Sequence, residues 1–270
     1  RECGVRRQSC WIILCLINES TESSSGPVAI DANDLTGVNL TLGAQEVHVW
    51  HASLDDHAAD RFQLVLADDE ISRADRFHFA KDRNHYVVAR GLLRKLLGGY
   101  AGVAASDLRF AYTEKGKPSL AEREAGLINF NLAHSHGRAI YAFTVGRELG
   151  VDLEFMRTDF AGGKIAERFF STAEIIALTA VPPELKQRAF FDCWTRKEAY
   201  LKARGDGLSM PLDKFEVSLA PGEEAALLWN YQDPAEVTRW TMHSIPAPSG
   251  YAAALVVEGQ DWSLKTFRLV

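Results

Sequence analysis

Cysteine is scarce in this 270-residue sequence, and the positions of the few cysteines exclude two kinds of site. There are four, three of them before residue 16, and no two form a Cys-x-x-Cys pair. This spacing indicates neither a zinc site nor a disulfide framework. Cys193 stands alone in the body of the chain, where a single cysteine is more often a small buried apolar residue than a nucleophile.

Long apolar runs and an excess of positive charge are also missing. The run Trp11–Ile17 is too short to cross a bilayer and is short for a signal sequence. The formal net charge of −6 argues against a strongly basic nucleic-acid-binding protein. We therefore expect a cytoplasmic protein that binds neither a membrane nor a nucleic acid.

The first 43 residues differ in character from the rest. They begin with Arg1, and the stretch Asn18–Pro27 is a polar run typical of a flexible linker. We expect residues 1–43 to be a disordered extension, or an upstream stretch translated in error, that does not pack on the core.

Helix and strand patterns follow one another in an order that recurs along the chain. Alternation predicts a strand over Glu46–Leu54, and helical spacing of apolar residues predicts helices over Ala80–Tyr100 and from Arg188. A shift of 105 residues aligns a few positions of the two halves, such as Phe110 with Phe215. The order favours an α+β fold of two similar halves, 44–146 and 147–270, in a pseudo-twofold arrangement with the site in the cleft between them. Chance similarity of two helix–turn–strand units is the alternative.

Two acids lie on one face of a predicted strand. In "GVDLEFMR", Asp152 and Glu154 are two residues apart, so their carboxylates point the same way. They form either a solvated acidic face or a site for a hard divalent cation, which prefers carboxylate oxygens.

A third carboxylate follows in the long helical stretch "FFDCWTRKEAYLKARGDGL". Glu198 and Lys202 are neighbours at i, i+4 and alone would make an ordinary surface ion pair. Together with the acid pair, Glu198 completes a set of three carboxylates that suits Mg²⁺, and lysines nearby would offset phosphate charge.

More cations gather in the first half. "KGK" (Lys115–Lys117) and "NLAHSHG" (Asn131–Gly137) place lysines, histidines and backbone amides in loops. A loop residue such as His134, or a helix residue such as Arg73, is usually solvated. Together, however, these groups suit an anionic ligand with several phosphates.

Four motifs make the sequence resemble the 4′-phosphopantetheinyl transferases, specifically the two-halved type that activates surfactin synthetase. In chain order, "GKPSL", "NFNLAHSHG", "GVDLE" and "WTRKEAYLK" match that family's motifs at about the family's spacing, and the resemblance covers about Val47–Leu219. Ala133 departs from the usual serine, so a hydroxyl contact with phosphate would be absent there while the backbone amide remains.

The resemblance implies both a reaction and the residues that carry it. The family transfers the phosphopantetheine arm of coenzyme A to a serine of an apo acyl or peptidyl carrier protein and releases adenosine 3′,5′-bisphosphate. It implies Mg²⁺ ligands at Asp152, Glu154 and Glu198, with Glu198 also the candidate acceptor of the serine proton, and a pyrophosphate contact at Lys202. It assigns the nucleotide and its phosphates to Arg73, Lys115, Lys117, Ala133 and His134.

Two other functions stay open at this stage. One is a different Mg²⁺-dependent enzyme acting on a nucleotide pyrophosphate, and the other is a non-catalytic module that binds carrier proteins or coenzyme A. The three acids argue against the module, because binding alone has no evident need of them. We expect a monomer, since two fused halves would supply both walls of the cleft.

Overall fold

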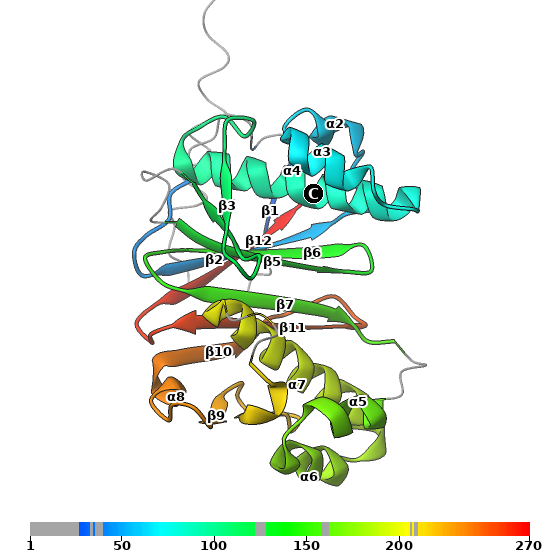
Figure 1. The fold of residues 1–270 in the computed structure, drawn as a ribbon, viewed down its shortest axis with the longest axis vertical. Helices are drawn as coiled ribbons and strands as arrows, with labels where there is room; N and C mark the ends of the chain where they lie inside the picture. The colour runs from blue at the N-terminus through cyan, green and yellow to red at the C-terminus, as the bar shows by residue number, and fades with distance from the viewer. Residues whose placement is uncertain are drawn as a thin grey trace, which may run out of the picture.

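The fold contains two sheets in contact, each with a long helix on its outer face (Figure 1). The computed structural model describes residues 27–32, 35, 40–121, 128–157, 162–205, 207 and 210–270. In this part of the chain helices and strands mix in the predicted way, which confirms the α+β class.

The first sheet has five strands and is covered by the long helix α4 (Ala80–Ala101). Two short helices, α2 (Asp60–Gln63) and α3 (Asp68–Ala74), pack against α4. Strands β1 and β12 run parallel to each other and β12 runs parallel to β2, while the remaining pairs are antiparallel. The strand order is β1 (Val28–Ile30), β12 (Ser263–Leu269), β2 (Glu46–Ser53), β6 (Arg138–Val145), β5 (Ile128–Ser135).

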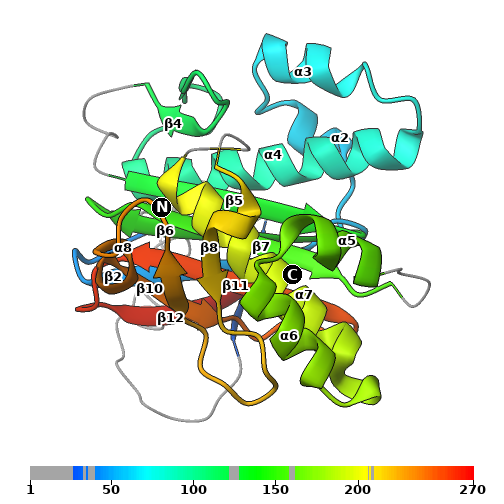
Figure 2. The same cartoon turned by 60° about the horizontal axis from the view of Figure 1, so that its bottom comes forward.

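The second sheet has three antiparallel strands and carries the other long helix, α7 (Pro183–Arg204). Its order is β10 (Trp240–Ser244), β11 (Tyr251–Glu258), β7 (Leu149–Phe155). Figure 2 shows α7 with α5 (Gly162–Phe169) and α6 (Thr172–Ala180) on the side of the sheets away from α4. The smaller elements are β3 (Phe110–Tyr112), β4 (Pro118–Leu120), a 3₁₀ turn (Leu212–Lys214), β8 (Phe215–Val217), β9 (Leu227–Asn230) and α8 (Glu236–Arg239).

Each long helix ends where a glycine enters the left-handed region. Gly102 (φ 68°) follows α4 and Gly205 (φ 72°) follows α7, a conformation that glycine adopts without a steric cost. The helix predicted over Ala80–Tyr100 ends one residue later, at Ala101, and Gly98 lies inside it. A Cβ there would stand 2.8 Å from the carbonyl oxygen of Val103, so the chain leaving the helix needs a glycine at this position.

The two halves share an order of elements. Both α4 and α7 have 22 residues, both end at a left-handed glycine, and a short strand follows each, β3 after α4 and β8 after α7. The pseudo-twofold relation between the halves stays a prediction. The division of the chain is also less simple than a cut near residue 146, because the last strand, β12, lies inside the first sheet.

The two sheets meet along β5 and β7. Here side chains of β5 bond to the backbone of β7: Asn131 Oδ1 accepts from the Val151 amide at 3.0 Å, and Ser135 Oγ accepts from the Phe155 amide at 3.1 Å. An apolar core that includes Val49, Ile140 and Leu255 fills the space between the sheets. The acid-bearing strand is therefore held directly against the first half.

The expectation for residues 1–43 does not hold where the structure describes them. Val28–Ile30 forms strand β1 and pairs with β12, and Ala32, Leu35 and Leu40 are buried in the core under α4. These apolar segments are short and follow a polar stretch, so the sequence alone gave no clear sign that they are buried. Residues 1–26 lie outside the described residues, as does the linker predicted there. No helix in the described ranges is both long enough and apolar enough to span a bilayer.

Candidate active site

Close contact between β7 and α7 brings two of the motifs together. A Cβ at Gly150 would lie 2.1 Å from the Ala199 carbonyl oxygen and 2.3 Å from the Ala203 amide nitrogen, so only glycine allows the helix to lie this near. Gly150 starts the "GVDLE" motif and Ala199 follows Glu198 in "KEA". The glycine thereby places the acids of β7 opposite the charged face of α7.

Asp152 and Lys202 form the central contact of the site. Lys202 Nζ donates to Asp152 Oδ1 at 2.7 Å and to the Val151 carbonyl at 3.2 Å. The other carboxylate oxygen of Asp152, Oδ2, is buried and has no hydrogen-bond partner among the described residues. A buried anionic oxygen without a donor is costly, so this atom fits a position that a bound cation would complete.

Glu154 and Glu198 lie close enough to Asp152 to feel its charge. Burial raises the pKa of Glu154 above its usual range, and the Asp152 carboxylate raises it further, against a 3.2 Å hydrogen bond from Ser135 Oγ. Burial likewise raises the pKa of Glu198, with Asp152 as the next cause and Lys202 opposing. The three predicted metal ligands therefore share one electrostatic neighbourhood.

The acids do not close on a single point. Within the described ranges, no three histidine, cysteine, aspartate or glutamate side chains stand close enough together to hold a metal ion. The ammonium of Lys202 pairs with Asp152 instead and offsets part of the repulsion among the acids. Lys202 therefore forms its ion pair with Asp152 on the strand, and not the ordinary helix-surface pair with Glu198, its i, i+4 neighbour.

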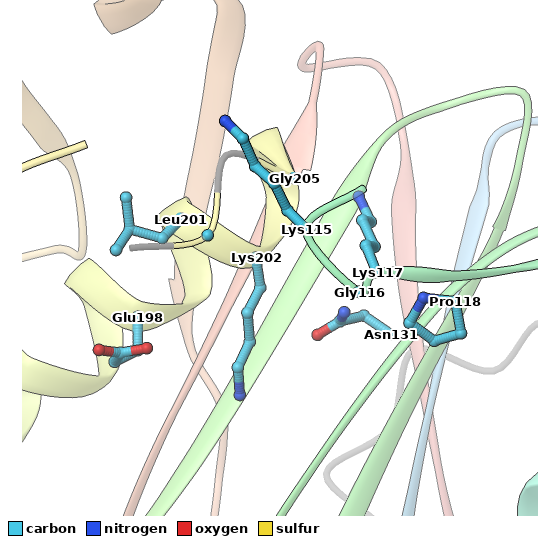
Figure 3. A pocket seen from close by; sticks show the side chains of 10 residues that line it. Lys115, Gly116, Lys117, Pro118, Asn131, Glu198, Leu201, Lys202 and Gly205 are labelled. Atoms are coloured by element: carbon cyan, nitrogen blue, oxygen red, sulfur yellow. The ribbon is translucent and has the colours of Figure 1, made fainter. Parts of the chain in front are cut away.

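A cavity of about 250 Å³ lies beside these residues, between the loop joining β3 to β4 and the end of α7. The loop contributes Lys115–Pro118, and α7 and the residues after it contribute Glu198, Leu201, Lys202, Gly205 and Gly207; Asn131 completes the wall. Figure 3 shows Glu198 and Lys202 extending from α7 with the lysine loop alongside. Four of the predicted site residues, Lys115, Lys117, Glu198 and Lys202, line this one cavity.

The other predicted site residues lie elsewhere. Arg73 is exposed on α3, with its guanidinium 5.7 Å from the Tyr86 ring centroid, and does not line the cavity. The side chain of Ala133 is buried in the core between the sheets. His134 on β5 has a surface position, but neighbouring protein desolvates its ring and lowers its pKa, and repulsion from Lys202 and His85 lowers it further. His134 therefore belongs to the same electrostatic neighbourhood as Lys202.

Sequence reasoning missed the residues that hold the site in place. Gly150 sets the approach of α7, Asn131 and Ser135 fasten β7, and Lys197 next to Glu198 is fully buried. Their partners are distant in sequence, so spacing alone carries no signal for them. Gly150, Asn131, Ser135 and Lys197 all lie inside the quoted motifs, but the motifs do not show which element each side chain contacts.

Two family models match consecutive parts of the chain. Residues 49–145 match 4′-phosphopantetheinyl transferase, N-terminal, and residues 148–256 match the 4′-phosphopantetheinyl transferase superfamily. The 4′-phosphopantetheinyl transferase HetI of Nostoc sp. (strain PCC 7120) is 40% identical over 231 residues, which cover 84% of this chain and 94% of HetI. The chain belongs to the 4′-phosphopantetheinyl transferase superfamily.

Other relatives in this enzyme family are more distant. The 4′-phosphopantetheinyl transferase Sfp of Bacillus subtilis (strain 168) is 31% identical over 166 residues, 62% of this chain and 72% of Sfp. Among solved structures, a holo-(acyl-carrier-protein) synthase from Bacillus anthracis in complex with CoA (3′,5′-ADP) is 22% identical, with a TM-score of 0.34 over 42% of this chain and 96% of that one. The match to the superfamily model spans the three acids and Lys202.

Proposed function

We propose that this chain transfers the 4′-phosphopantetheine group of coenzyme A to a serine hydroxyl of an apo carrier protein. The serine oxygen forms a bond to the β-phosphorus, the bond from that phosphorus to the bridging oxygen breaks, and adenosine 3′,5′-bisphosphate leaves. The observation that carries the proposal is the approach of α7 to β7 at Gly150, which brings Glu198 and Lys202 together with Asp152 beside a cavity rimmed by lysines.

We propose coenzyme A as the co-substrate of this cavity. Lys115 and Lys202 come from its two walls and suit the negative charge of a pyrophosphate, because an ammonium acts as a point charge toward phosphate. His134 lies in the electrostatic neighbourhood of Lys202, and Arg73 is exposed, so we propose both as contacts of the 3′-phosphate. The side chain of Ala133 is buried, so this residue can contribute only its backbone.

Mg²⁺ is the proposed metal, with Asp152, Glu154 and Glu198 as its ligands. Two observations fit: the unpartnered, buried Oδ2 of Asp152, and the raised pKa of both glutamates, which a cation would lower again. When bound, the ion supplies charge stabilisation for the pyrophosphate. Glu198 is also the proposed acceptor of the serine proton, because its carboxylate lines the cavity in which the pyrophosphate is proposed to bind.

We further propose that the protein acts as a monomer, because one chain supplies both walls of the cavity. The proposed partner is an apo acyl or peptidyl carrier protein, because HetI and Sfp are 4′-phosphopantetheinyl transferases.

The test is incubation of the protein with coenzyme A, Mg²⁺ and a panel of apo carrier proteins, followed by intact-mass spectrometry. We expect a mass gain of one phosphopantetheine on at least one carrier, none on the same carrier with its serine changed to alanine, and release of adenosine 3′,5′-bisphosphate. Nucleotide release without carrier modification would favour the other Mg²⁺-dependent enzyme, and coenzyme A binding without either product would favour the module.

A further inference from the structure

The contacts of Lys117 differ from those expected of a phosphate ligand. Its Nζ lies 2.7 Å from Glu148 Oε2 and 2.9 Å from the Ala203 carbonyl oxygen. The Lys117 side chain is only 18% exposed, compared with 46% for Glu148. Two of the three ammonium hydrogens are therefore donated to the protein itself.

These two acceptors lie in the second half of the chain, whereas Lys117 lies in the first half. Ala203 lies in the last turn of α7, where carbonyl groups lack a partner within the helix and the helix dipole places partial negative charge. Glu148 directly precedes β7. Lys117 thus caps the end of α7 from outside and ties the loop between β3 and β4 to both elements.

The residues after α7 are shaped to receive this loop. A Cβ on Gly205 (φ 72°) would lie 3.3 Å from Lys117 Cδ, and one on Gly207 (φ 56°) would lie 3.6 Å from Lys115 Cβ. Both glycines have a positive φ, which other residues adopt with strain. The lysine stems of the loop therefore rest directly on the chain that leaves the helix.

We propose that Lys117 is a positioning residue. It fastens the Lys115–Pro118 loop to α7 and so holds the two walls of the cavity, with Lys115 on one and Glu198 on the other, at the separation that the ligand needs. Its ammonium is engaged by Glu148 and Ala203 and is not a ligand of a coenzyme A phosphate. The inference rests on the proposed function, because coenzyme A is the ligand it concerns.

A double-mutant cycle separates positioning from phosphate binding. We would compare Lys117→Met, Glu148→Gln and the double variant in calorimetric binding of coenzyme A and 3′-dephospho-coenzyme A, and in the KM and kcat of transfer. Each single change should weaken the binding of coenzyme A about fivefold, which corresponds to about 1 kcal/mol of binding free energy. The double variant should be no weaker than Lys117→Met alone, because both changes break the same contact.

Three further readouts distinguish the roles. Positioning predicts that the preference for coenzyme A over its 3′-dephospho form is unchanged in Lys117→Met, that kcat and the KM for the carrier hardly move, and that Lys117→Arg restores binding. The matched control is Lys214→Met, which removes the lysine of an exposed 3.0 Å ion pair with Asp213 outside the cavity and should bind as wild type.

Two results would overturn the inference: a Glu148→Gln variant that binds coenzyme A as well as or better than wild type, or a Lys117→Met variant that loses the preference for the 3′-phosphate. Either would mean that Lys117 meets a phosphate directly. The binding arm does not depend on transfer, so a protein that binds coenzyme A without modifying any carrier would refute the proposed function while the cycle still decides the role of Lys117.

Discussion

At the scale of single residues, the site brings together carboxylates that repel one another. Three carboxylates share a half-buried space with one ammonium, and the pKa of Glu154 and of Glu198 is raised first by burial and then by the charge of Asp152. Such an arrangement costs stability, and the proposed cation would offset part of that cost. Neutralising one acid is therefore expected to damage the reaction more than the fold.

We predict that Glu198→Gln folds normally and loses transfer by at least about two orders of magnitude, or about 2.7 kcal/mol of activation free energy. Its melting temperature should equal or exceed that of wild type, because the change relieves repulsion from Asp152. Transfer rates and thermal melts of Glu198→Gln and Asp152→Asn across a Mg²⁺ titration provide the measurement.

The control for that series is Glu184→Gln, a change of an exposed glutamate in the first turn of the same helix. Added Mg²⁺ should recover part of the rate if the loss lies in metal affinity, and little if Glu198 also accepts the proton. A Glu198→Gln variant that transfers at nearly the wild-type rate would remove Glu198 from the site.

His51 predicts how stability depends on pH. Burial lowers the pKa of His51 to about 4 in the folded protein, from 6.5 in an exposed chain, and its Nε2 is buried without a partner. The unfolded chain therefore takes up the proton first as the pH falls. The stability contributed by neutral His51 is complete above about pH 6.5 and is lost as the pH falls toward 4.

Urea unfolding between pH 7 and pH 4 tests this sign. We expect the free energy of unfolding to fall with pH less steeply in His51→Phe than in wild type, because one proton-binding group is removed from the unfolded chain. His78→Phe, at an exposed position, should keep the wild-type slope. Equal slopes in all three proteins would show that His51 is protonated equally in both states.

At the scale of elements, α7 differs most from its appearance in the sequence. Arg196 and Lys197 are charged residues of this helix, yet they are only 3% and 0% exposed. Lys197 pairs with Glu174 at 2.8 Å and donates to the carbonyls of Leu212 and Phe215. Its partners lie on α6, in the 3₁₀ turn Leu212–Lys214 and at the first residue of β8, so the charge fastens three elements around the helix that carries Glu198.

Removing this buried cation should be strongly destabilising. Lys197→Met leaves Glu174 without its counter-ion and two buried carbonyls without a donor, which we expect to lower the free energy of unfolding by about 3–5 kcal/mol. The double variant Lys197→Met/Glu174→Gln should recover part of that loss. Denaturant unfolding measures both, and a loss below about 1 kcal/mol in the single variant would contradict the account.

Local spacing predicted the elements and the acids well, for a physical reason. Strand alternation alone places Asp152 and Glu154 on one face, and helix spacing alone places Glu198 one turn before Lys202. Two strands around a polar turn at His134–Gly137 were also predicted. The structure confirms both strands, but β5 continues to Ser135, so His134 lies in the strand and not in a loop. The contact of Lys202 with Asp152 was not predictable in this way, because it depends on how closely β7 and α7 approach.

The start of the second long helix shows the same limit. We expected it from Arg188, but α7 begins at Pro183, because proline is favoured in the first turn of a helix, where its missing N–H leaves no bond unmade. The helix stripe was read correctly and its boundary was not. This boundary was visible in the sequence as Pro183, whereas contacts between elements depend on tertiary packing, which no local pattern contains.

Strand β1 gives a prediction about the first residues of the fold. Compared with a chain that begins at Pro27, one that begins at Gln45 loses the β1–β12 pairing and the buried side chains of Ala32, Leu35 and Leu40. We expect it to be less stable by about 2–4 kcal/mol, since each buried leucine contributes about 1.5–3 kcal/mol. Equal melting temperatures of the two chains would show that this segment adds nothing to the core.

At the scale of the whole molecule, β12 makes the two halves dependent on each other. This last strand lies between β1 and β2 in the first sheet, although it follows the whole second half in the sequence. Its register pairs Phe267 with both Val28 and Trp50, and the Phe267 ring stacks on the Trp50 ring at 4.5 Å between centroids. The first half thus contains a strand that a cut near residue 146 removes.

We predict that a fragment of residues 27–146 does not unfold cooperatively on its own. Without β12, β1 loses its pairing partner, β2 keeps only β6, and the ring of Trp50 loses its cover, so the core under α4 is open at one side. The same fragment joined through a flexible Gly/Ser linker to residues 259–270 should regain a cooperative transition, while a linker followed by the same twelve residues in scrambled order should not. Urea unfolding followed by circular dichroism and by tryptophan fluorescence measures all three.

If the unextended fragment unfolds as cooperatively as the extended one, β12 is dispensable and the halves are independent after all. If only the true strand restores the transition, the first half depends for its stability on a strand that follows the whole second half in the sequence.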